Sequence, residues 1–98
     1  MGFNKGEKIM VDISIIDGNV GALTFVMDAY NLNMIKAERA FHKMQDNGII
    51  GEKLYLLWND CCDRNTIKTL DMINNNDIET INHYLNYGHG RGIPYERG

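Results

Sequence analysis

The stretch that decides the fold is residues 49–62, IIGEKLYLLWNDCC, the most apolar segment of the chain. Four of its side chains recur at the i, i+3, i+4, i+7 spacing of one helical face: Leu54, Leu57, Trp58 and Cys61. Tyr55 and Cys62 extend that face at its edge. The pattern predicts a helix with a broad buried face and with Trp58 in the protein core.

Glycine and Asn/Asp clusters divide the rest of the chain at regular intervals, which is typical of several short helices. Four further helices are predicted at residues 20–30, 34–47, 66–75 and 78–87. The residues expected to cap their N-termini are Asn19, Asn33, Asp63 or Asn65, and Asn76 or Asp77. Gly18, Gly48 and Gly88 are expected to end the helices that precede them.

The spacing of apolar residues also predicts which face of each helix is buried. In residues 20–30 these positions are Leu23, Val26, Met27 and Tyr30, and in residues 34–47 they are Ile35, Ala37, Ala40, Phe41 and Met44. In the last two helices they are Ile67, Leu70 and Ile73 or Met72, then Ile78, Ile81 and Leu85, with Tyr84 beside them.

The first segment, EKIMVDISIIDG (residues 7–18), fits both a helix and a strand, because its isoleucines satisfy both periodicities. A single strand would have no partner, so we interpret it as a helix. The expected fold is all-α, a compact orthogonal bundle of five to six short helices with a Gly-rich C-terminal tail. It forms a single domain over residues 1–98, with an N-terminal arm (1–7) and tail (89–98) that are less ordered.

The composition restricts the function classes. The net charge is −3, and the acidic balance disfavours a nucleic-acid binder. No apolar run approaches a membrane span, and the N-terminus lacks a signal-peptide core, so we expect a soluble cytoplasmic protein with reduced thiols. A chain of 98 residues has little core of its own, which favours a homo-oligomer, most simply a dimer.

Cys61 and Cys62 raise the question of metal or thiol chemistry. Adjacent cysteines do not have the spacing of a zinc site, and no histidine follows a ligand motif, so neither a metal nor a cofactor is expected. Flanking aspartates and a helix C-terminus raise a thiol's pKa, which disfavours a nucleophile. A Cys–His pair with His83 or His89 stays open as the enzymatic alternative, but we expect small buried side chains and no catalysis.

Polar groups gather at two places. Asn59, Asp60, Asp63 and Arg64 follow the apolar helix, where a carboxylate could hold Arg64 and leave its other donors for an anion. Three more donors lie in the glycine-rich tail: His89, Arg91 and Tyr95. We predict a ligand-binding site from these seven residues. The alternative is that the first group only caps helices and the tail is loose.

Three blocks, DGNVGAL, GIIGEKLYLLWNDCCDRNT and INHYLNYGHGRGIPY, resemble a family of small uncharacterised proteins from phages and mobile elements of Gram-positive bacteria. The resemblance covers roughly residues 12–95; where Val20 stands here, a proline is common in that family. It implies an origin but no activity.

Three functions compete. The first is a binding protein that acts without catalysis, in counter-defence, by sequestering a small anionic ligand such as a signalling nucleotide or by blocking a host protein. The second is a DNA-binding or regulatory helical domain, with Lys36, Arg39 and Lys43 as a modest basic edge. The third is a cysteine-dependent enzyme.

Overall fold

The fold is entirely helical over residues 12–87, the part of the chain that the computed structural model describes. Five α-helices occur there: α2 (Val20–Leu32), α3 (Met34–Asp46), α4 (Glu52–Leu56), α5 (Thr66–Asn75) and α6 (Ile78–Tyr87). Two short turns complete them, the 3-10 turn η1 (Ile13–Ile15) and the π-helical turn η2 (Leu57–Cys61). The predicted all-α bundle is therefore confirmed.

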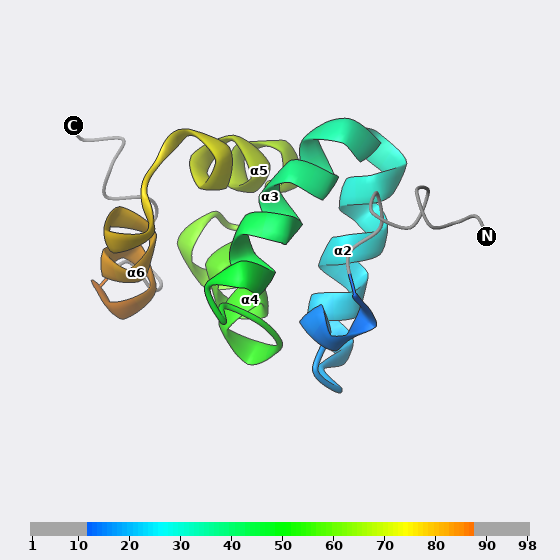
Figure 1. The fold of residues 1–98 in the computed structure, drawn as a ribbon, viewed down its shortest axis with the longest axis horizontal. Coiled ribbons are helices and arrows are strands. Elements are labelled where there is room, and N and C mark those ends of the chain that lie inside the picture. Colours follow the sequence, from blue (N-terminus) through cyan, green and yellow to red (C-terminus); the bar gives the residue numbers. More distant parts are fainter. Residues whose placement is uncertain (1–11, 88–98) are drawn as a thin grey trace.

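Helix α3 runs through the middle of the molecule (Figure 1). It packs against α2 on one side and against α5 on the other, while α4 packs against α2 and continues directly into η2. Helix α6 lies at the opposite end of the molecule from α2 and packs on η2 (Figure 1). Because η2 touches α4, α5 and α6, the stretch 57–61 connects α6 with the rest of the bundle.

The predicted N-caps explain where the helices begin. The side chains of Asn19, Asn33 and Asn65 accept hydrogen bonds from the backbone N–H three residues on, at 2.9, 3.1 and 3.1 Å. Asp77 does the same for Thr80 at 2.9 Å. Asn33 also donates its own N–H to Ala29 at the end of α2, so one residue ends one helix and starts the next. This single-residue link forces the chain to bend sharply between α2 and α3.

The first segment differs from its prediction. Within the described residues it contains only η1, one 3-10 turn, and residues 7–11 lie outside them. Gly18 (φ 72°) ends this segment in the left-handed region, as predicted, and Asp17 before it (φ 46°) shares that conformation. The turn is held by long-range contacts, since the Gly51 N–H donates to the Ile15 carbonyl at 2.8 Å.

The core lies where α2, α3, α4, η2 and α5 meet. The largest fully buried side chains come from these elements and from η1 and α6: Phe25, Phe41, Ile15, Met44, Leu54, Leu57, Leu70, Met72, Ile73 and Ile81. Phe25 lies edge-on to Phe41 and stacks on Trp58, with ring centroids 5.2 Å apart in both pairs. The predicted face of the apolar stretch is confirmed, because all four of its residues are buried.

The predicted face of α2 was wrong in part. Leu23 and Met27 are exposed, at 38% and 62%, and the buried face is formed by Ala22, Phe25, Val26 and Ala29. Two other residues predicted as core, Ile35 (75% exposed) and Ile67 (37%), also lie at the surface. Both lie in the first turn of their helices, and Ile35 comes two residues after the Asn33 link between α2 and α3.

Candidate functional site

The end of the apolar stretch is a π-helical turn rather than a regular α-helix. In η2 the backbone widens over Leu57–Cys61, and this allows Cys61 and Cys62 to be buried side by side. The turn closes when the Arg64 N–H donates to the Trp58 carbonyl at 2.7 Å and the Asn65 N–H to the Cys62 carbonyl at 2.9 Å. Single π-turns inside helices are frequently found at functional sites.

The chain then reverses through two left-handed residues in succession. Asp63 has φ 53° and Arg64 has φ 59°, a conformation that costs a residue with a Cβ atom about 1–2 kcal/mol. Neither residue is glycine, so packing on both sides must hold the reversal. We call residues 55–66 the corner, because they join α4 and η2 to the start of α5.

Arg64 is the exposed cation of the corner, and neutral groups hold it. Its Nε donates to the Asn59 side-chain oxygen at 2.6 Å, and its Nη2 lies 3.5 Å from the Tyr55 hydroxyl. Its guanidinium carbon lies 5.1 Å from the centre of the Trp58 ring, a cation–π distance. Within residues 12–87 it forms no ion pair, so its charge is not neutralised there.

Asn59 connects Arg64 to a carboxylate. The Asn59 amide nitrogen donates to Asp60 Oδ1 at 2.6 Å while its oxygen accepts from Arg64. We expected a carboxylate to hold Arg64 directly, and here the structure corrects the prediction. An amide between the two charges orients the guanidinium without a direct ion pair, and it leaves the outer N–H donors of Arg64 accessible to an anion.

Trp58 is the fixed base beneath Arg64. Its indole N–H donates to the Thr66 hydroxyl at 3.0 Å, and that hydroxyl donates to Asp28 of α2 at 2.5 Å. Trp58 is only 5% exposed, and Thr66 is buried as well. Because a buried indole N–H needs an acceptor, this chain of hydrogen bonds ties the corner to α2 and α5 at once.

Tyr55 completes the corner, and its position depends on a close approach to α2. A Cβ atom placed on Gly21 would lie 2.2 Å from Tyr55 Cδ1, so only glycine allows the ring to lie against the helix there. Tyr55 also lies edge-on to Trp58, with centroids 6.4 Å apart. The ring is thereby confined, and its hydroxyl reaches the rim where Arg64 lies.

The two cysteines lie in the interior, beneath the exposed residues of the corner. Cys61 is fully buried and its thiol donates to the Tyr84 carbonyl of α6 at 3.2 Å. Burial, and then the neighbouring Cys62 and Asp60, raise the pKa of the Cys61 thiol to about 12. A thiol with this pKa stays protonated at neutral pH, the opposite of what a nucleophile requires. Burial raises the pKa of Tyr84 as well.

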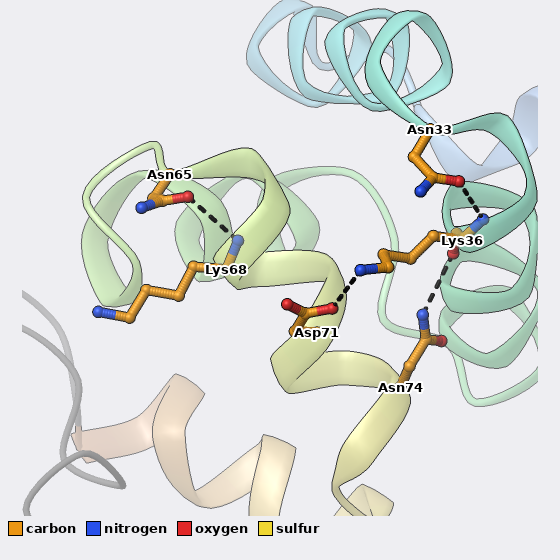
Figure 2. A network of polar contacts seen from close by, with 6 residues as sticks. All are labelled: Asn33, Lys36, Asn65, Lys68, Asp71 and Asn74. Carbon is orange, nitrogen blue, oxygen red and sulfur yellow. Dashed lines mark hydrogen bonds and ion pairs between the residues drawn. The ribbon is translucent and has the colours of Figure 1, made fainter.

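A second polar region lies between α3 and α5 (Figure 2). The Lys36 ammonium lies 2.7 Å from Asp71 Oδ1, and the Asn74 amide donates to the Lys36 carbonyl at 3.2 Å. These side chains line a shallow hollow of about 510 Å³ together with Asn33, Ile35, Arg39 and Asn75. The Asn74 Oδ1 atom is buried and has no hydrogen-bond partner within the described residues.

The predicted basic edge of α3 is largely occupied by the fold. Lys36 is paired with Asp71, and the Lys43 ammonium donates to the Ile73 carbonyl at 2.7 Å and to the Asn76 carbonyl. Lys43 therefore satisfies carbonyls at the C-terminal end of α5, where a cation is favoured. Of the three basic residues, only Arg39 is exposed.

Four of the seven predicted site residues lie in the corner. Asn59, Asp60 and Arg64 form one chain of hydrogen bonds, and Asp63 lies exposed in the turn. The other three, His89, Arg91 and Tyr95, lie outside the described residues. Sequence reasoning missed Tyr55 and Thr66 as parts of the corner. The only available signal for Tyr55 was its position at the edge of the apolar face, nine residues before Arg64.

Comparisons with protein-family models, with curated proteins and with solved structures find no match to this chain. Among residues 12–87, no group of three or more metal-ligating side chains converges on a point that could hold an ion. None of the helices formed by those residues has both the length and the apolar character needed to cross a bilayer.

Proposed function

We propose that this chain is a small binding protein that acts without catalysis and takes up an anionic group, a phosphate or a carboxylate, at Arg64. The observation that carries the proposal is the way Arg64 is held: stacked on Trp58, hydrogen-bonded to a neutral amide and in no ion pair within the described residues. A guanidinium fixed in this way is prepared for an anion, because less rotamer entropy is lost on binding.

The electrostatic setting supports a local site. The chain carries a net charge of −3, so a small anion gains nothing from the overall field and needs donors placed where it binds. Arg64 provides such donors, and the Tyr55 hydroxyl adds one more. The N-terminus of α5, which begins at Thr66 two residues after Arg64, adds a favourable dipole.

The buried cysteines support a role in binding over one in thiol chemistry. The Cys61 thiol donates to a backbone carbonyl of α6, and burial raises its pKa to about 12. The basic residues of α3 give little support to the DNA-binding alternative, because Lys36 and Lys43 are engaged within the fold. A small ligand or an acidic surface of a partner protein suits the one guanidinium of the corner better than a nucleic-acid backbone does.

The resemblance to phage and mobile-element proteins gives the proposal a biological setting. In that setting the anion is part of a host signalling nucleotide or of a host protein, and the protein acts in the host cytoplasm by sequestering or blocking it. This part rests on the resemblance, and the binding site rests on the geometry of the corner.

The chain contains a built-in probe for the test. Trp58 is its single tryptophan and lies directly beneath Arg64, so an anion bound there changes its fluorescence. Titration of the full chain with pyrophosphate, AMP and a cyclic dinucleotide is expected to give a saturable change with at least one of them. Arg64→Met keeps an apolar cover over Trp58 and removes the charge, and it should weaken binding about 10–100-fold.

Arg39→Met is the matched control, because Arg39 is an exposed arginine on a different surface and its loss should leave the affinity unchanged. Wild-type affinity in Arg64→Met would show that Arg64 only covers Trp58. Loss of affinity in Arg39→Met alone would instead place the anion in the hollow between α3 and α5.

A further inference from the structure

Helix α2 carries apolar side chains on its outer face as well as on its inner face, beside a polar row formed by Thr24, Asp28 and Asn31. Its inner face contributes Phe25 and three other residues to the core, but its outer face also carries apolar side chains: Val20 (75% exposed), Leu23 (38%) and Met27 (62%). These positions follow the i, i+3, i+7 spacing of one helical face.

The outer face is also nearly free of charge. In its 13 residues α2 has one side chain that is charged at neutral pH, Asp28, and its carboxylate accepts a hydrogen bond from Thr66. Helix α3, which has the same length, carries lysine, arginine, glutamate, histidine and aspartate. A surface exposed to water in the working protein would be expected to look like α3.

The shape of the face is uneven along its length. Near the middle and the C-terminal half, a hollow of about 450 Å³ is lined by Thr24, Met27, Asp28 and Asn31. Towards the N-terminal end Val20 and Leu23 stand exposed. When two copies of such a helix run antiparallel, the exposed side chains of one lie opposite the hollow of the other, and the same contact occurs twice.

We propose that the outer face of α2 pairs with the same face of a second copy of this chain, across a two-fold axis that passes near Thr24. Self-pairing requires that each side chain tolerate its own kind nearby, because a two-fold contact is formed by the same patch on both copies. A strongly charged face would repel itself, whereas this face consists of valine, leucine, methionine, threonine and asparagine apart from the engaged Asp28.

The expected strength follows from the area. A helix of 13 residues is about 20 Å long, so two copies that cross on it bury an area at or below the lower limit of specific interfaces, about 1,200 Å². Interfaces of this size associate weakly. We therefore expect a reversible dimer with a dissociation constant of about 10–500 µM rather than an obligate one.

Sedimentation velocity of the full chain between about 5 µM and 1 mM tests this directly. The expected result is a shift from about one to two chain masses over that range. Val20→Glu and Met27→Glu each place one charge per copy in the contact and should raise the dissociation constant at least about tenfold. Val20 is the first residue of α2, where an acidic side chain favours the helix, so this variant keeps the fold.

Ile35→Glu is the matched control, since Ile35 is as exposed as Val20 but lines the hollow between α3 and α5. It should dimerise like the wild type. A chain that stays monomeric at 1 mM overturns the proposal and leaves the face to another partner or to the chain's own ends. A dimer that Met27→Glu and Val20→Glu leave intact, or that Ile35→Glu disrupts, moves the interface elsewhere.

Discussion

Basic side chains occur both in the corner and where α3 packs on α5, a contact we call the seam. The two regions use these side chains in opposite ways. In the seam, Lys36 pairs with Asp71, and the Lys43 ammonium donates to the backbone carbonyls of Ile73 and Asn76. In the corner, Arg64 lies over an aromatic ring and is oriented by an amide. The seam's charges hold two helices together, whereas the charge in the corner is positioned and left available.

This difference identifies residues whose loss should harm the fold and residues whose loss should harm binding. A cation that donates to backbone carbonyls within the fold leaves those carbonyls without a bond when it is removed. A charge held by neutral groups at the surface contributes little to stability and is available to a ligand.

The largest effect is expected from removing the base of the corner. Trp58→Ala would leave a large cavity beside Phe25 and strip the hydrogen bond from Thr66, at a cost of about 3–5 kcal/mol in the free energy of unfolding. Chemical denaturation followed by circular dichroism measures it. The control is Tyr87→Ala, an aromatic residue 68% exposed, which should change stability by less than about 0.5 kcal/mol. Equal costs for the two variants would contradict this placement of Trp58.

The thiol behind the corner should be unreactive in the folded state. The pKa of Cys61 is raised from 9.0 to about 12, so the folded chain holds this proton more tightly than the unfolded chain does. Its contribution to stability is therefore complete below pH 9 and is lost as the pH rises towards 12. In Cys62→Ala, which leaves Cys61 as the only thiol, labelling by a disulfide reagent at pH 8 should be slow until urea is added. Rapid labelling of the native protein would point to an accessible thiolate.

The seam should respond to a smaller change. Lys43→Met retains most of the aliphatic stem and removes the ammonium, leaving the carbonyls of Ile73 and Asn76 without that donor. The free energy of unfolding should fall by about 1–3 kcal/mol. Arg64→Met should cost less than about 1 kcal/mol, the range of an exposed cation–π contact. If Arg64→Met proved the more destabilising of the two, the contrast between corner and seam would be reversed.

The smallest effect tests the left-handed turn. Asp63 has φ 53° and is exposed, and glycine adopts that conformation without the Cβ penalty. Asp63→Gly should therefore stabilise the protein by up to about 1 kcal/mol, partly offset by the greater freedom of glycine in the unfolded chain. Thermal denaturation gives the sign. A clear loss of stability would indicate that the Asp63 side chain contributes a contact of its own.

Local signals in the sequence predicted the helices well. The asparagine and aspartate caps act within three residues of themselves, so Asn19 and Asn33 could be placed without knowledge of the fold. For the last two helices the sequence left two candidates each, and the structure selects Asn65 over Asp63 and Asp77 over Asn76. The buried face of α2 could not be chosen in this way. Because the helix has apolar residues on two faces, Leu23 and Met27 fit a buried stripe as well as Phe25 and Ala29 do.

The corner shows a similar division. Its polar residues lie close together in the sequence, so their grouping was predictable from Asn59 to Arg64. The π-turn and the left-handed pair depend on packing from α2, α5 and α6, through Gly21, Thr66 and Tyr84. No periodicity within residues 49–66 contains that information, which is why the amide that holds Arg64 was not foreseen.

The π-turn also affects how this protein should be compared with others. A π-turn inside a helix holds one residue more than an ordinary turn, so a chain one residue shorter between Leu57 and Cys61 could close a regular α-helix instead. The residues beyond the deletion would keep their faces, because the wide turn holds the deleted residue, but the bond from the Arg64 N–H to the Trp58 carbonyl, which spans six residues, would be lost with that turn. Such a relative would keep the bundle and lose the corner. The spacing from the tryptophan to the arginine is therefore a stricter test of shared function than the presence of either residue.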